Sequence, residues 1–135
     1  MKILALLIGS YAPLMLLIHV STAKILQAWN EHPGSWISRC FPPRRALRVE
    51  GLFWVLALVS WFLWQSLLWK VLVVLFAAIH LGIWAAAEFR ARGKSSSTFT
   101  ASPTLNRAIV IFDMAEAVVL VGIGIVAILY LIRAV

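Results

Sequence analysis

Charged residues are scarce in this sequence. Lys, Arg, Asp and Glu together make up 13% of its 135 residues, whereas hydrophobic residues make up 63%. Soluble domains carry about 25% charged residues, so the composition excludes an ordinary soluble protein. A mean hydropathy of +0.96 leads to the same conclusion. We therefore expect a single integral membrane domain, residues 1–135, with no room for a separate soluble catalytic domain.

Cysteine is nearly absent as well. Cys40 is the single cysteine of the chain, which excludes an internal disulfide and a paired-cysteine metal site. The sequence also lacks a c-type haem motif, a Walker loop, a dinucleotide-binding fingerprint and a nucleophile elbow. These absences favour a protein that is not an enzyme, although membrane enzymes often spread their sites thinly across helices.

What the chain has instead is long apolar runs. Residues 51–87 would measure about 56 Å as one helix, nearly twice the ~30 Å of a bilayer core. Polar side chains meet Trp64 and Trp69 midway along this run, and tryptophan is typical of membrane interfaces. We therefore expect a chain that folds back on itself, with spans at about residues 51–66 and 69–88.

Two more apolar runs complete the expected fold. They predict helices at about residues 3–22 and 103–132, the second beginning where Ser102 can cap and Pro103 fits the first turn. The expected fold class is all-α, a polytopic membrane protein. Its expected architecture is a four-transmembrane-helix bundle with a tight hairpin between the second and third helices.

The distribution of basic residues predicts the topology. Of the 12 Lys and Arg, about nine lie in or beside two loops, at about residues 23–49 and 89–102, and loops rich in Lys and Arg are retained in the cytoplasm. Both termini are then extracytoplasmic, in what we expect to be a bacterial inner membrane. We expect the basic side chains to contact anionic lipid headgroups and not nucleic acid. The residues concerned are Arg44, Arg45, Arg48, Arg90 and Arg92.

Four ionisable residues are expected inside the membrane, where such groups are costly and are functional candidates. They are His19, His80, Asp113 and Glu116. Turned inward, they would form a cluster suited to a proton, a cation or a transition metal. The alternatives are structural, such as an Asp113 pair with Arg107 or Arg90. The bound cofactor is unknown; haem or a metal at His80 and His19 is not favoured, because His80 is expected several ångströms deeper.

Three sets of residues predict helix contacts. Trp54, Trp61 and Trp64 are spaced to share one face of the second helix, toward lipid or a partner. Small residues at Ala78, Gly82 and Ala86 predict a close approach of another helix, either internal or from another chain. Gly122 and Gly124 offer a further packing site in the last helix.

These observations lead to one functional hypothesis and two alternatives. The first is a small non-catalytic accessory, assembly or stabilising subunit of a larger inner-membrane complex, whose partners are lipids and other subunits or further copies of itself. The second is a homo-oligomeric transporter or channel that uses Glu116, Asp113 and His80. The third is a membrane enzyme that acts on a lipophilic substrate and requires the cytoplasmic arginines, Arg45 among them, to converge with His80.

Overall fold

The computed structural model describes residues 1–91 and 102–133, and in the first range it describes side chains through residue 89. Every regular element within these residues is helical. The expectation of an all-α fold is confirmed, because the described residues contain no strand. Six α-helices and one 3-10 helix, η1, follow one another along the chain. They are α1 (Lys2–Val20), α2 (Thr22–Glu31), α3 (Trp36–Cys40), α4 (Pro43–Val59), η1 (Trp61–Leu63), α5 (Leu67–Ala91) and α6 (Pro103–Arg133).

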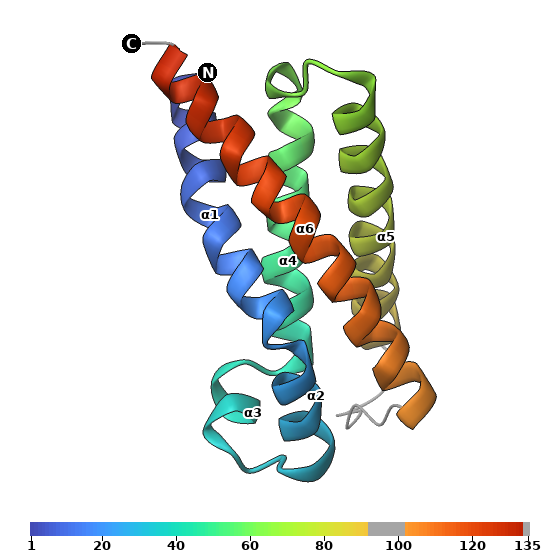
Figure 1. Cartoon of the computed structure of the whole chain (residues 1–135). Coiled ribbons are helices and arrows are strands. Elements are labelled where there is room, and N and C mark those ends of the chain that lie inside the picture. The colour runs from blue at the N-terminus through green and yellow to red at the C-terminus, as the bar shows by residue number, and fades with distance from the viewer. Residues whose placement is uncertain (92–101, 134–135) are drawn as a thin grey trace.

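The four long helices, α1, α4, α5 and α6, lie side by side as a bundle (Figure 1). α1 packs most extensively on α6, and α4 on the antiparallel α5. The start of α1 and the end of α6 lie at the same end of the bundle as the turn between α4 and α5, whereas α2 and α3 lie at the opposite end (Figure 1). The Tyr11 hydroxyl donates to the Val49 carbonyl at 2.7 Å and ties α1 to α4.

Three of these helices are long and apolar enough to cross a membrane. They cover Lys2–Val20, Leu67–Phe89 and Pro103–Arg133, with mean hydropathies of 2.1, 2.1 and 2.6. No more than 28% of the most apolar window of each is buried inside the protein, so most of their apolar surface faces outward. Such large exposed apolar faces are stable in lipid and unfavourable in water. The chain is therefore an integral membrane protein.

α4 is displaced along the sequence from the span expected at residues 51–66. It begins at Pro43, because a proline with its fixed φ suits the first turn of a helix. It ends at Val59, and η1 follows it. In the turn that leads to α5, the Gln65 side-chain amide donates to the Phe62 carbonyl at 2.6 Å, and the Trp69 amide donates to Ser66 Oγ at 3.3 Å. The chain reverses at residues 60–66, about where the hairpin was expected.

The expected tryptophan face is wrong, because α4 ends before two of its members. Trp54 and Trp64 are buried, at 0% and 1% exposure, whereas Trp61 is 44% exposed. Trp64 turns its indole back to donate to the Ala57 carbonyl at 2.8 Å. Two of the three tryptophans therefore belong to the protein interior and not to a surface for lipid or a partner.

The small residues expected at helix contacts fall into two groups, one packed between helices and one exposed on the surface of the bundle. A Cβ atom added at Gly124 would lie 3.6 Å from Ala12 of α1, and one added at Gly122 would overlap the Trp69 indole of α5. These two glycines therefore allow close packing of α6 on its neighbours. The three small residues of α5 are exposed instead, and nothing lies within 4 Å of a Cβ at the middle one. They are Ala78, Gly82 and Ala86.

Candidate metal centre

Three buried side chains from three different helices converge at one point. His19 comes from the last turn of α1, His80 from α5 and Glu116 from α6, and they are 1%, 5% and 0% exposed. The Nε2 atom of His19 lies 3.2 Å from Glu116 Oε1, and Nε2 of His80 lies 3.3 Å from Glu116 Oε2. One donor atom from each residue falls within 4.8 Å of the others. We call this group the His19–His80–Glu116 centre.

Both imidazole rings are oriented by the turn of helix that precedes them. Nδ1 of His19 lies 2.8 Å from the Met15 carbonyl oxygen, and Nδ1 of His80 lies 2.9 Å from the Phe76 carbonyl oxygen. A carbonyl can only accept a hydrogen bond, so each Nδ1 carries the hydrogen. In the neutral rings, both Nε2 lone pairs then face Glu116. A backbone carbonyl on the far nitrogen is the usual arrangement of metal-binding histidines.

Among the described residues, one oxygen of the Glu116 carboxylate accepts a hydrogen bond, and its donor is a tryptophan. Nε1 of Trp54, in α4, donates to Glu116 Oε1 at 3.0 Å. Glu116 Oε2 and His19 Nε2 are buried and have no hydrogen-bond partner of acceptable geometry among the described residues. Electron-rich atoms that face each other in a dry interior are costly unless a proton or a cation lies between them. The centre therefore suits a proton or a cation.

The spacing of the donor atoms suits a transition metal. Metal bonds of about 2.0–2.1 Å at a tetrahedral angle place neighbouring donors about 3.3–3.4 Å apart. The distances from the two Nε2 atoms to Glu116, 3.2 Å to Oε1 and 3.3 Å to Oε2, lie close to that value, and one donor atom from each residue lies within 4.8 Å of the others. Two histidines and one carboxylate form a ligand set that binds Zn²⁺ or Fe²⁺ and leaves a position open.

Two more carboxylates lie beside the centre. Asp113, one turn before Glu116 in α6, accepts a short hydrogen bond from the Thr22 hydroxyl at the start of α2. Glu50 of α4 places Oε2 at 4.0 Å from His80 Nε2. Asp113 forms no ion pair with Arg107 within the described part of the chain, and the Arg90 side chain lies outside it. The structure therefore places Asp113 beside the centre and without the expected Arg107 pair among the described residues, and a pair with Arg90 stays a prediction.

Aromatic rings shield the centre. The Trp54 ring stacks on His80 with ring centroids 5.7 Å apart, and on Phe76 at 5.5 Å. Phe112 lies 6.1 Å from His80 on another side. Toward the α4–α5 turn, Ser60 is the one buried polar side chain among the described residues. On these sides the surroundings of the centre are apolar, which strengthens electrostatic interactions inside it.

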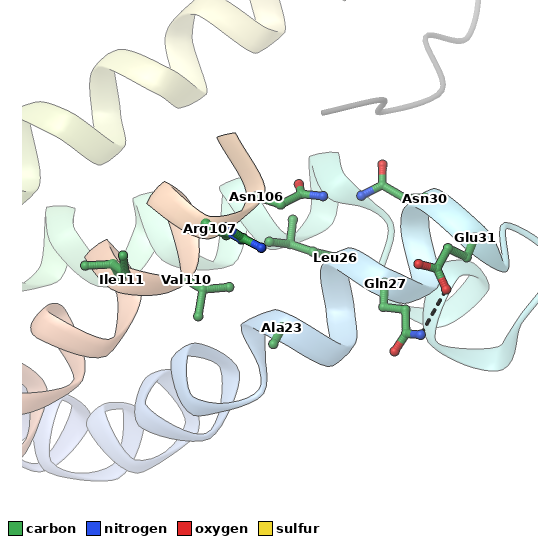
Figure 2. Close-up of a pocket in the computed structure, with 9 residues that line it drawn as sticks. All are labelled: Ala23, Leu26, Gln27, Asn30, Glu31, Asn106, Arg107, Val110 and Ile111. Atoms are coloured by element: carbon green, nitrogen blue, oxygen red, sulfur yellow. Dashed lines mark hydrogen bonds between the residues drawn. The ribbon is translucent and has the colours of Figure 1, made fainter. Parts of the chain in front are cut away.

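Two cavities lie at the α2 end of the bundle. One, of about 470 Å³, lies between α2 and the start of α6 and does not include any residue of the centre. Figure 2 shows Asn30 and Asn106 facing each other across it, beside the Gln27–Glu31 hydrogen bond of 2.9 Å. The other, of about 400 Å³, reaches the centre, because His80 lines it.

The sequence predicted which polar residues lie inside the bundle but placed His80 at the wrong depth relative to His19. The rings of His19 and His80 lie 6.2 Å apart, so the expectation of a depth mismatch that keeps them apart is wrong. α1 ends one residue after His19 and α5 eleven residues after His80, so the two helices do not end at the same level and the distance from a helix end does not give the depth. Glu50 was not among the expected polar residues; it falls between the expected loop, residues 23–49, and the span expected from residue 51. A helix read from Pro43 onward would have placed Glu50 one turn from the buried Ala46 and Trp54.

The basic residues expected at lipid headgroups lie at the surface where they are described. Arg44, Arg45 and Arg48 are exposed. Arg45 donates to the Cys40 carbonyl at 2.5 Å and does not converge with His80. Arg48 pairs with Glu88 at 2.7 Å, and this hydrogen bond and the opposite charge raise the pKa of Arg48. Arg92 and the side chain of Arg90 lie outside the described residues, so lipid contact stays a prediction.

No family model matches the chain, and no curated protein or solved structure matches it either.

Proposed function

We propose that this chain is a membrane-embedded metal-binding protein, which holds a divalent transition-metal ion such as Zn²⁺ or Fe²⁺ in the His19–His80–Glu116 centre. The observation that supports the proposal most directly is the convergence of three dry donor groups from three helices with unbonded atoms facing inward. Ionisable groups inside a membrane are costly, which makes them functional candidates. The Glu116 carboxylate lies between the two Nε2 atoms, an arrangement that favours a single ion over a haem.

The proposal includes a membrane topology. α4 is taken as a fourth span, paired with α5 in a hairpin, because the two helices are antiparallel neighbours in the bundle. The basic loops lead from the bundle end opposite the termini, where α2 and α3 lie (Figure 1). The retention of Lys and Arg in the cytoplasm then assigns that end to the cytoplasm of a bacterial cell and both termini to the other side.

A metal-binding role explains the burial of the His19–His80–Glu116 centre better than a transport path does. A transport path through Glu116 and His80 would need polar groups on both sides of the centre. The described side chains between the centre and the α4–α5 turn are mostly apolar, including Phe53, Val73 and Ile123. The roles as a transporter and as a subunit of a larger complex stay predictions.

Zn²⁺ binding to the purified protein tests the proposal. We expect one Zn²⁺ per chain, measured by elemental analysis and by competition with a chromogenic chelator. Replacing a ligand should weaken binding by more than about 100-fold, beyond the usual 10- to 100-fold cost of an outer-shell change. The variants are His19→Ala, His80→Ala and Glu116→Gln.

The chain offers a matched control. His32 is exposed and lies beyond the end of α2, so His32→Ala should leave the affinity for Zn²⁺ unchanged. Circular dichroism and gel filtration of each variant exclude unfolding as the cause of a loss. Stoichiometric Zn²⁺ that survives both His19→Ala and His80→Ala, or the absence of stoichiometric Zn²⁺ in the unmodified protein, would contradict the proposal.

A further inference from the structure

The cavity beside the centre combines an apolar wall with an acidic inner end. Its volume is about 400 Å³, within the range of small-molecule sites. Most of its lining is apolar and includes the rings of Trp29, Phe41 and Phe112. Its polar lining comprises Glu50, Asp113, His80 and Thr22. The division into an apolar body and a polar end is the shape of a site for an amphiphilic molecule.

The charges at the inner end all have one sign. Glu50 and Asp113 line the cavity, whereas no Lys or Arg among the residues described with side chains does. Asp113 accepts a hydrogen bond from Thr22, but no donor to Glu50 is found among the described residues. Glu50 is only 15% exposed, so its carboxylate is largely removed from solvent without a donor. Such a group is stabilised by a ligand that brings a donor or a positive charge.

The two carboxylates in the lining determine the sign of that ligand. A singly charged cation would offset the negative charge that Glu50 and Asp113 bring to the cavity. A carboxylate or phosphate head would instead be repelled, and desolvation of that head would have no compensation.

We propose that this cavity binds a lipophilic monocation of the alkylammonium class. Its tail lies among Trp29, Phe41 and Leu47, and its ammonium head contacts Glu50 and Asp113. Phe112 lines the cavity next to His80, and its ring would make a cation–π contact with the same head. The site goes beyond the proposed metal function, because neither His19 nor Glu116 lines the cavity.

Three probes with one tail and different heads test the proposal. Tritiated dodecylammonium is bound to the immobilised full-length protein in a scintillation proximity assay, with unlabelled dodecanoate or dodecanol as competitor. We expect dodecylammonium to bind about 10- to 100-fold more tightly than either, the range expected for charge-assisted hydrogen bonds. Equal binding of dodecanol, or preferential binding of dodecanoate, would overturn the proposal, and these comparisons need no variant to fold.

Variants locate the binding. Glu50→Gln should weaken dodecylammonium binding at least about tenfold, because it removes the charge that faces the head. Leu47→Trp should block the tail. Glu88→Gln is the matched control, since Glu88 lies outside the lining. His19→Ala should lose Zn²⁺ and keep dodecylammonium, so the two proposals fail separately. Unchanged dodecylammonium binding in both Glu50→Gln and Leu47→Trp would contradict this site.

Discussion

At the scale of single residues, Trp54 is the side chain that connects the parts of the centre. It donates to Glu116 and stacks on His80, so it positions two of the three proposed ligands. Its own position in the core is fixed by Phe53 and Phe76, whose rings it contacts. A ligand oriented by a second residue binds metal more strongly, because less ordering is required when the ion binds.

Replacing Trp54 by Phe should therefore reduce metal affinity without removing a ligand. Phe keeps a ring against His80 but leaves Glu116 Oε1 without its donor, which should lower the Zn²⁺ affinity about 10- to 100-fold. The unfolding free energy should fall by about 1–3 kcal/mol. A chelator competition titration measures the first, and denaturation in mixed micelles the second.

Trp84→Phe is the matched control for that prediction. Trp84 also donates to a glutamate, Glu88, at 3.3 Å, but that glutamate belongs to the surface pair with Arg48. Its replacement should leave Zn²⁺ affinity unchanged. Equal affinities of the Trp54→Phe variant and the unmodified protein would show that Trp54 does not support Glu116 as a ligand.

At the scale of helices, close packing is confined to particular faces. α1 and α6 approach each other at Gly124 and Ala12, and α6 accommodates the Trp69 ring of α5 at Gly122. The exposed small residues of α5 point away from all described neighbours. In lipid, where no hydrophobic force draws helices together, such fits provide much of the packing energy.

Two Gly→Ala substitutions in the membrane helices should therefore differ in sign. Gly122→Ala forces the Trp69 ring to move and should lower the unfolding free energy by about 1–3 kcal/mol. Gly82→Ala meets nothing within 4 Å and should be neutral or stabilise the helix by up to about 1 kcal/mol. Denaturation in mixed micelles measures both. A loss in Gly82→Ala as large as in Gly122→Ala would mean that Gly82 has a contact outside this chain.

At the scale of the whole molecule, the exterior is apolar, unlike that of a soluble protein. Large apolar side chains cover the outside of α1, α5 and α6, whereas the interior holds His19, His80 and Glu116. The bilayer accepts the apolar exterior, and the charged groups avoid hydrocarbon by facing one another. α2 and α3 lie at one end of the bundle, and the α4–α5 turn lies at the other (Figure 1).

Single-cysteine labelling tests the proposed topology. Cys40 is exposed at the α3 end, and Gln65 is exposed in the α4–α5 turn. In intact spheroplasts, a membrane-impermeant maleimide should label a Cys40→Ser, Gln65→Cys variant and leave Cys40 of the unmodified protein unlabelled until the membrane is permeabilised. Labelling of both positions in intact cells would show that α4 does not cross. Labelling of Cys40 alone would reverse the orientation.

The sequence by itself determined the membrane class, the helical fold and most of the polar residues of the centre. Apolar length and the scarcity of charge are properties of composition, and a bilayer leaves few alternatives to helices that satisfy their own backbone. The Ser102-Pro103 pair likewise lies at the start of α6, where the Leu105 amide donates to Ser102 Oγ at 3.2 Å.

Only the tertiary structure decided which polar residues meet. The rotation of each helix and its position along the bundle depend on side-chain fits between helices, such as Trp69 against Gly122 and Tyr11 against Val49. These contacts join residues far apart in the chain, so no local pattern specifies them. They turn Trp54 inward and Gly82 outward, and they bring Glu50 to His80.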